Sequence, residues 1–298
     1  MPYRNIFIAN EASLKLKQNQ LVVNNGVEYT FPIEDIRSIV IDNPQSSFSV
    51  KLMSFLGENG VCVIMCNEKH TPCCQLLPIG TYCRTLKRIE LQQNQTKPKL
   101  KRIWQKIVIK KIENQAKCLE LNGINNEKLI SISKAVQSGD ASNREGYAAN
   151  IYFKLLFGND FTRGQESCIN AALNYGYAIL RSYIAKTIVA LGLEASIGIH
   201  HKNQLNSFNL ADDIIEPFRP TVDLLVSKYL DFEHGFELAH KAQLQRLLNC
   251  VCIVDDNNWS LSKSIELMTQ GIISCFENDN FSDLKLPDLT DISYFDYD

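Results

Sequence analysis

Residues 21–31 have the sequence LVVNNGVEYTF, in which two runs rich in β-branched and aromatic residues flank the turn-forming tripeptide at 24–26. Asn and Gly tolerate the positive φ that a tight turn requires, so this stretch predicts a β-hairpin. Residues 46–56 instead carry apolar residues at the spacing of an α-helix, which predicts one short helix. Further strands are expected at residues 3–8, 13–17, 36–41 and 61–66. Residues 1–80 are therefore predicted to form a small β-rich domain with a single helix.

From residue 82 onward, apolar residues recur about every 3.6 residues in place of every second residue. This period is typical of α-helices. Helices are expected at residues 99–122, 127–136, 142–157, 164–191, 210–230, 236–254 and 260–276. Runs of strands followed by runs of helices predict the α+β class, with a small N-terminal β-rich domain and a larger all-α C-terminal domain. The predicted divisions are the β-rich domain at 1–80, a linker at 81–98, the α-helical domain at 99–280 and an acidic tail at 281–298.

The composition is that of an ordinary globular protein: 45% of the 298 residues are apolar and 21% are charged. The chain is long enough for about two domains of ordinary size. No uncharged apolar run reaches the ~18 residues of a membrane span, and the first 17 residues lack the apolar core of a signal peptide. Ten cysteines without an export signal indicate reduced thiols. We therefore expect a cytoplasmic protein that does not associate with membranes.

The charged residues are distributed unevenly along the chain. Residues 84–117 hold eleven basic residues against two acidic ones, a net charge of +9 in a chain whose total is −2. Such a segment is typical of a nucleic-acid-binding surface, although basic surface helices without a ligand are also common. The residues expected to contact DNA are Arg84, Lys87, Arg88, Lys97, Lys99, Lys101, Arg102, Lys106, Lys110 and Lys111. Residues 277–298, with seven acids and one lysine, are expected to be either a disordered tail or an intramolecular competitor for the basic segment.

Three segments of the predicted helical domain carry residue types suited to catalysis. In the first, Glu145 follows Ser142 by three residues, which is also the spacing of a capping box without a catalytic role. In the second, His200 and His201 lie in a polar loop, and imidazole is a common metal ligand and general base. Adjacent side chains in extended backbone point in opposite directions, so at most one of these histidines is expected to serve a given site.

The third segment contains Asp213 and Glu216, which a helix places on the same face. Acidic residues also favour the first turn of a helix for electrostatic reasons, but Pro217 places Glu216 at an interruption of the helix. Together the three segments offer carboxylates and imidazole, a combination that suits Mg²⁺ or Mn²⁺ better than structural zinc. A hard cation beside a basic surface indicates phosphodiester chemistry.

The same three segments resemble the motifs of a known family. They are REGYAANIYF at 144–153, GIHH at 198–201 and NLADDIIEPFRP at 209–220, in the family's order and approximate spacing. Over almost its whole length the chain resembles the integrase of CRISPR adaptation, the first-numbered Cas protein, in its type II form. This resemblance, more specific than any single motif, implies an enzyme that both cuts and joins DNA.

The resemblance also implies which residues form the site. Glu145, His201 and Glu216 would be the catalytic residues and the ligands of the metal, with Asp213 as an auxiliary ligand. His201 is preferred to His200 because the family's histidine usually lies fifteen residues before the motif's glutamate, as His201 lies before Glu216. The implied cofactor is Mg²⁺ or Mn²⁺.

The implied partners follow from the same resemblance. A homodimer would form through residues 1–80, and two dimers would flank a dimer of the small ferredoxin-like second Cas protein, joined by other type II CRISPR proteins. This assembly would bind a short duplex of foreign double-stranded DNA and join its 3′-hydroxyls to the CRISPR repeat. Two other hypotheses stay open: a non-catalytic DNA-binding scaffold, and a zinc hydrolase that uses His200, His201 and Glu216.

Overall fold

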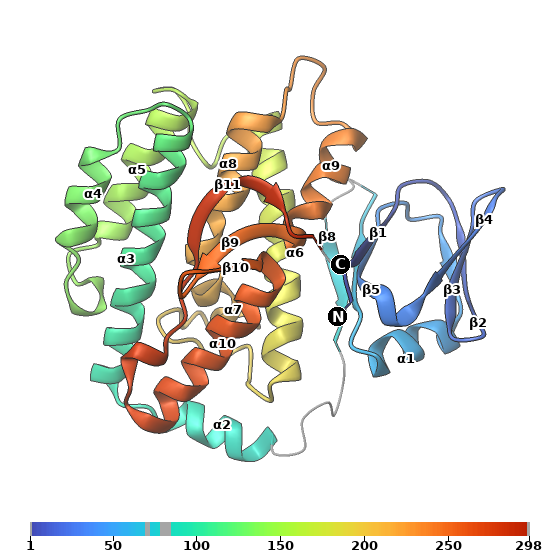
Figure 1. The fold of residues 1–298 in the computed structure, drawn as a ribbon, viewed down its shortest axis with the longest axis horizontal. Coiled ribbons are helices and arrows are strands. Elements are labelled where there is room, and N and C mark those ends of the chain that lie inside the picture. The colour runs from blue at the N-terminus through green and yellow to red at the C-terminus, as the bar shows by residue number, and fades with distance from the viewer. Residues whose placement is uncertain (1, 69–71, 78–84, 297–298) are drawn as a thin grey trace.

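The computed structural model describes residues 2–68, 72–77 and 85–296, and Figure 1 shows its fold. The N-terminal part consists of short strands and one α-helix. Its elements are β1 (Arg4–Ile8), β2 (Ser13–Lys17), β3 (Gln20–Asn24), β4 (Glu28–Pro32), the 3₁₀ helix η1 (Ile33–Asp35), β5 (Ile36–Ile41), β6 (Ser47–Phe48), α1 (Val50–Glu58), β7 (Cys62–Cys66) and β8 (Pro72–Leu76). The strands form two sheets, in the orders β1-β5-β7-β8 and β4-β3-β2-β6.

The hairpin predicted from residues 21–31 is present. Strands β3 and β4 pair antiparallel with Asn24 opposite Glu28, and Gly26 in the turn has a φ of +103°. Residues with a Cβ atom are strained at this φ, which explains the glycine. In the other sheet β1, β5 and β7 run parallel, and β8 is antiparallel to β7.

The sheet β1-β5-β7-β8 separates two hydrophobic cores. Ile39 on β5 and Val63 on β7 face the core that β2, β3 and α1 complete. Their neighbours Val40 and Ile64 belong to the core of the helical part. This alternation follows from the two-residue period of a strand. The N-terminal sheet is thus covered on one face by the chain's own helices, above all by α6, which contacts β7 and β8.

The C-terminal part is mostly helical (Figure 1). Its helices are α2 (Thr85–Gln93), α3 (Lys97–Leu121), α4 (Glu127–Lys134), α5 (Arg144–Phe157), α6 (Cys168–Ala190), α7 (Asn209–Ile214), α8 (Arg219–Tyr229), α9 (Leu238–Gln245) and α10 (Leu261–Asn278), with 3₁₀ helices η2 (Ser138–Asp140), η3 (Glu216–Phe218), η4 (Arg246–Asn249) and η5 (Phe281–Asp283). Helix α2 lies within the segment predicted as a linker. In the described part of the chain, no helix is both long and apolar enough to cross a membrane.

The α+β fold class is confirmed, but the C-terminal part also contains a small sheet. Strands β9 (Cys250–Val254), β10 (Asn257–Ser260) and β11 (Asp288–Tyr294) form an antiparallel sheet in the order β10-β9-β11. Residues 250–254 were expected to end a helix, but their β-branched side chains favour a strand. Strand β11 occupies part of the predicted acidic tail, and buries Leu289 against α3. The C-terminal domain is therefore mainly helical and not all-α.

A buried ion pair joins the two parts of the molecule. Asp42, which follows β5, lies 3.2 Å from the ammonium of Lys241 on α9. Both side chains are less than a tenth exposed. Nearby, the Arg37 guanidinium on β5 donates a hydrogen bond to the carbonyl oxygen of Leu248 at 3.4 Å. The N-terminal sheet is therefore bound to the helical part by polar contacts as well as by the shared core.

Candidate active site

Glu145 lies in the first turn of α5, and its side chain is not needed to cap that helix. The N-cap residue is Asn143. The carboxylate of Asp140 accepts hydrogen bonds from the backbone N–H groups of Arg144 at 2.8 Å and Glu145 at 3.0 Å. The Glu145 carboxylate points elsewhere, and its Oε1 lies 2.5 Å from Nζ of Lys111 on α3. The capping-box interpretation of Glu145 is therefore wrong.

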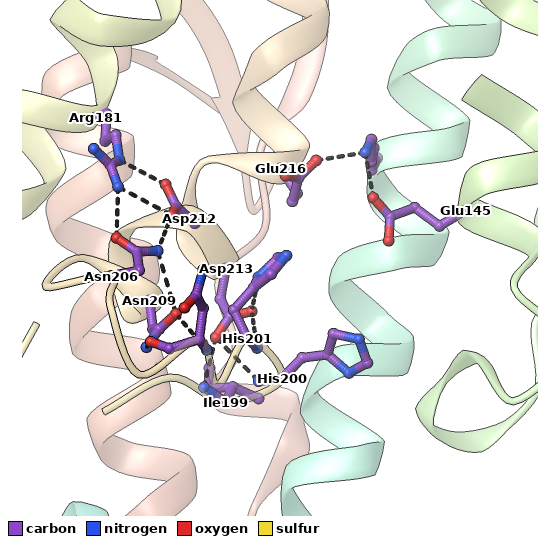
Figure 2. A network of polar contacts seen from close by, with 12 residues as sticks. Glu145, Arg181, Ile199, His200, His201, Asn206, Asn209, Asp212, Asp213 and Glu216 are labelled. Atoms are coloured by element: carbon purple, nitrogen blue, oxygen red, sulfur yellow. Dashed lines mark hydrogen bonds and ion pairs between the residues drawn. The ribbon is translucent and has the colours of Figure 1, made fainter. Parts of the chain in front are cut away.

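Glu216 lies at the break between α7 and α8, where it begins the 3₁₀ helix η3. The two prolines at 217 and 220 occupy first-turn positions of η3 and α8, where a missing N–H is tolerated. The Glu216 side chain is only 6% exposed. Its Oε1 accepts a hydrogen bond from Nε of Arg219 at 3.0 Å, and its Oε2 lies 2.5 Å from Nζ of Lys111. Glu145 and Glu216 thus meet at one lysine (Figure 2).

The charges at this meeting point stabilise one another. Burial on its own raises the pKa of the Glu216 carboxyl, but Arg219 and Lys111 lower it more, to about 2. Burial lowers the pKa of the Lys111 ammonium, but the carboxylates of Glu216 and Glu145 raise it above its ordinary value. Glu216 and Lys111 are therefore both charged at neutral pH. Buried charges are tolerated only when they are paired, so Glu216 requires a cation beside it.

Asp213 holds the loop that carries the two histidines. Its carboxylate is fully buried and accepts hydrogen bonds from the backbone N–H groups of Ile199 (2.5 Å), His200 (3.0 Å) and His201 (3.2 Å). It also contacts Nδ1 of His201 at 2.7 Å (Figure 2). A Cβ atom on Gly198 would collide with this carboxylate and with the His201 carbonyl oxygen, which explains the glycine. Both carboxylate oxygens of Asp213 are engaged, so its observed role is to position the loop.

The contact with Asp213 determines which nitrogen of His201 is available. The hydrogen bond to Asp213 raises the pKa of His201, and the charge of Glu216 adds to the effect. When Nδ1–H of a histidine donates to a carboxylate, the neutral ring presents Nε2 as an acceptor or metal ligand. The His200 ring instead stacks on Trp104 with 4.3 Å between ring centroids and an interplanar angle of 2°. This geometry favours His201 over His200 as the histidine of the site.

A second set of polar residues fixes the same loop, and the sequence reasoning missed it. The side-chain amide of Asn209 donates to the carbonyl oxygens of Ser196 at 3.0 Å and Asn203 at 2.9 Å. Asp212 forms a bidentate contact with Arg181 on α6, at 2.6 Å and 3.1 Å (Figure 2). Asn209 and Asp212 lie in the NLADD part of the third motif. Polar residues in a mostly buried helix were the signal that could have identified them.

Of the three predicted metal ligands, Glu145 and Glu216 are brought together, and Lys111 takes part in their arrangement. Within the described residues, no group of three His, Cys, Asp or Glu side chains stands ready to hold a metal ion. Two of the three, Glu145 and Glu216, share the Lys111 ammonium. Oε2 of Glu216 is buried, and among the described residues its one recorded partner is that ammonium. Two carboxylates that converge on a cation beside a histidine fit a hard divalent ion such as Mg²⁺ or Mn²⁺.

The predicted DNA-binding residues occupy different environments in the structure. Arg84 lies outside the described residues. Lys111 is buried in the site and is not part of a surface. The exposed members of the set, all on α2 and α3, are Lys87, Lys97, Lys101, Arg102 and Lys106. These five side chains are the members of the predicted set that solvent reaches in the described part of the chain.

The acidic C-terminal residues contact the remaining basic ones. Glu277 forms an ion pair with Arg88, and Asp279 lies 2.5 Å from Lys99. Asp288 on β11 lies 2.5 Å from Lys110. Of the two expectations for residues 277–298, the structure therefore favours intramolecular pairing with the basic segment over a disordered tail.

The fold and the site define the class of protein: an α+β chain whose mainly helical domain brings two carboxylates together at a buried lysine and holds a histidine on a third carboxylate. The family described as CRISPR associated protein Cas1 matches residues 6–234. This chain belongs to the Cas1 family.

Individual relatives agree with this assignment. The chain is 37% identical over 306 residues to the CRISPR-associated endonuclease Cas1 of Neisseria meningitidis serogroup C (strain 8013), and the match covers all of both chains. A structure of a casposase bound to integration product has a TM-score of 0.75 and 19% identity, and covers 94% of this chain and 92% of that one. A Cas6-RT-Cas1–Cas2 complex gives a TM-score of 0.71 at 16% identity, and covers 95% of this chain and 36% of that one. At these identities the two structures demonstrate a shared fold.

Proposed function

We propose that this chain is the metal-dependent DNA integrase and endonuclease of CRISPR adaptation, with Glu145, His201 and Glu216 as its catalytic residues. The observation that carries the proposal is the convergence of Glu145 and Glu216 on one cation, next to a histidine whose Nδ1 is held by Asp213. Membership of the Cas1 family and similarity to the Neisseria endonuclease support it.

The reaction is a transesterification at phosphorus. The 3′-oxygen of a foreign DNA end forms a new P–O bond, and the bond between that phosphorus and a 3′-oxygen of the repeat strand breaks. The attacking hydroxyl releases its proton and the leaving oxygen takes one up, so the number of phosphodiesters is unchanged. With water in place of the 3′-hydroxyl, the same step cuts DNA. A bound Mg²⁺ or Mn²⁺ would polarise the phosphoryl oxygen and stabilise the leaving oxygen.

Four side chains of the site have separate roles in this reaction. Glu145 and Glu216 supply anionic oxygen ligands from two different elements, and His201 supplies Nε2. Asp213 keeps the His201 ring in one orientation, as carboxylates commonly do for metal-binding histidines. An open hollow of about 410 Å³ borders His201 and is lined in part by Lys202. Neither Glu145 nor Glu216 lines this hollow, so it adjoins the site on the side of the histidine loop.

The exposed basic residues of α2 and α3 are proposed to hold the DNA. They are Lys87, Lys97, Lys101, Arg102 and Lys106. Contacts of lysine and arginine with phosphates are independent of sequence, which suits an enzyme that accepts many different foreign fragments. Phosphate contacts also set the position of the strand relative to the catalytic residues.

The proposed assembly is a homodimer bound to the small second Cas protein. The structurally similar Cas6-RT-Cas1–Cas2 complex combines a Cas1 with a Cas2, which supports the second partner. Edge strand β4 and the turn before it expose Val27 (58%) and Tyr29 (48%), and an exposed apolar sheet edge is a natural dimer contact. Tyr29→Asp in the full chain should therefore yield a monomer by light scattering. A Tyr29→Asp protein that still dimerises would contradict a contact at β4.

Strand-transfer assays test the enzyme proposal against the scaffold and zinc hypotheses. Glu145→Gln should reduce Mg²⁺- or Mn²⁺-dependent joining of a labelled duplex to repeat DNA by on the order of 10²-fold or more, because it removes a charged ligand. Glu113→Gln, an exposed carboxylate on α3, serves as the matched control and should retain activity. Equal activity of the two variants would overturn the proposed site. Activity with Zn²⁺ alone would favour the hydrolase, although the stacking of His200 on Trp104 argues against that hypothesis.

A further inference from the structure

Lys111 is placed where a metal ion would have to bind. It comes from the middle of α3, its side chain is 9% exposed, and Nζ lies 2.5 Å from both Oε1 of Glu145 and Oε2 of Glu216. An ammonium group is a compact cation with three donors and no acceptor, so it satisfies two carboxylates at once. The two oxygens around Nζ belong to the same side chains that the proposed function assigns to the divalent ion.

We propose that Lys111 is an internal cation that competes with the divalent metal for Glu145 and Glu216. This inference rests on the metal site of the proposed function and adds a step to it. A divalent ion binds carboxylate oxygens at about 2.0–2.6 Å, a shell of the same size as the one around Nζ. Two cations cannot share that shell, since their repulsion at such distances is large in a buried site. Metal loading therefore requires the ammonium of Lys111 to leave the two carboxylates.

The surroundings of Lys111 permit this exchange. Glu216 keeps the hydrogen bond from Arg219 at 3.0 Å when the ammonium leaves, so it does not become an isolated buried charge. Glu145 is 24% exposed and can be hydrated. The Asp213 contacts that hold His201 do not involve Lys111. The lysine thus neutralises the carboxylates of the metal-free protein without being required for the arrangement of the loop.

The exchange makes a quantitative prediction for metal affinity. If Lys111 occupies the carboxylates for nine-tenths of the time or more, the apparent dissociation constant for metal is raised about tenfold or more. Lys111→Met, which keeps an unbranched side chain one atom shorter and removes the charge, should therefore bind Mn²⁺ at least ~10-fold more tightly than the unmodified protein. Lys106→Met, an exposed lysine of the same helix, is the matched control and should bind Mn²⁺ with unchanged affinity. Electron paramagnetic resonance of free Mn²⁺ measures both constants without any activity assay.

A second measurement uses the unmodified protein and does not depend on the folding of a variant. Acetylation of lysine amines, read by mass spectrometry, should increase severalfold at Lys111 when Mn²⁺ is added, because the ammonium is displaced. Acetylation at Lys106 should not change, and Glu216→Gln should abolish the response at Lys111.

The outcomes separate this inference from the proposed function. Mn²⁺ binding that is abolished in Glu216→Gln but unchanged or weaker in Lys111→Met would overturn the competition alone. Labelling of Lys111 that stays constant or falls on addition of Mn²⁺ would do the same. Mn²⁺ binding that is indifferent to Glu216→Gln would overturn the proposed metal site, and the competition with it.

Discussion

Two buried lysines show how the same side chain serves different ends in this molecule. Lys241 contacts one carboxylate, that of Asp42, at 3.2 Å, and lies near the rings of Tyr175 and Phe236. Lys111 contacts two carboxylates at 2.5 Å each. Both lysine side chains are 9% exposed, so burial does not distinguish them. What differs is the number of carboxylates that converge on each ammonium.

The number of carboxylates at each lysine determines whether the cluster can bind a further ion. One lysine with one carboxylate is a neutral pair that has no reason to take up a further ion. At Lys241 this pair joins the N-terminal sheet to α9. At Lys111 two carboxylates converge on one ammonium, while Arg219 contacts only Oε1 of Glu216. Two carboxylates at one point repel each other unless a cation lies between them. A single pair therefore acts as a structural contact, and two converging carboxylates form a place for a cation.

The largest expected effect is the loss of stability when the neutral pair is broken. Lys241→Met should lower the free energy of unfolding by about 3–5 kcal/mol, since it leaves the buried Asp42 carboxylate without its lysine. Lys111→Met should cost less, because Glu216 keeps Arg219. Urea unfolding in EDTA measures both values. The double variant with Asp42→Asn should recover part of the loss.

Lys241→Met and Lys111→Met also test whether the two lysines differ in function. Strand transfer per folded molecule should be unchanged in Lys241→Met, because that lysine lies at the junction with the N-terminal sheet. If Lys111→Met destabilises the protein as much as Lys241→Met, the two lysines are equivalent structural contacts. The distinction between a single ion pair and two carboxylates that converge on one lysine would then be wrong.

A smaller, pH-dependent effect is expected at His201, whose ring contacts Asp213. The contact with Asp213 raises the pKa of His201 above its ordinary value of 6.5, so the folded protein binds this proton more tightly than the unfolded chain does. The resulting stabilisation is complete below that value and is lost as the pH rises through the raised pKa. His201→Asn should therefore destabilise the metal-free protein more at about pH 5.5 than at about pH 8. Urea unfolding in EDTA at both pH values measures the difference.

The control for this prediction is His234, an exposed histidine between α8 and α9. His234→Asn should change stability by the same small amount at both pH values. A destabilisation in His201→Asn that does not depend on pH would mean that the proton on His201 is not stabilised by Asp213.

Local patterns explain what the sequence could predict. The hairpin at 24–26 depends on two neighbouring runs and a turn, and it is present as predicted. The three motifs each lie at a helix start, a loop or a helix break, where the chemistry of single residues determines the local structure. Strand β11 could not be predicted in this way. It depends on pairing with β9 and on Asn114 of α3, whose side chain accepts a hydrogen bond from the backbone of Leu289 at 3.1 Å.

Lys111 was predicted to contact DNA because it belongs to a basic segment, but it is buried between Glu145 and Glu216. It is one of the eleven basic residues at 84–117, and nothing in that count separates it from Lys106. The helical period does separate them. Ile107 and Val108, four and three residues before Lys111, are fully buried, and Gln115, four residues after it, is also buried. A lysine on the buried face of a helix requires acidic partners, and only the tertiary structure identifies them as Glu145 and Glu216.

The smallest effect per residue is expected on DNA binding by the exposed basic residues of α3. Lys101, Arg102 and Lys106 are exposed, whereas Lys111 contacts carboxylates in the interior. Replacing the three exposed residues by Gln should lower the slope of log K against log[salt] for duplex DNA by roughly 0.9 for each phosphate that the protein no longer neutralises. Lys111→Met in EDTA should leave that slope unchanged, because its ammonium has no access to phosphates while it lies between Glu145 and Glu216. Fluorescence anisotropy across a salt series measures both slopes. An unchanged slope in the triple variant would mean that DNA does not bind to this face of α3, and a reduced slope in Lys111→Met would place its ammonium on the DNA even without metal.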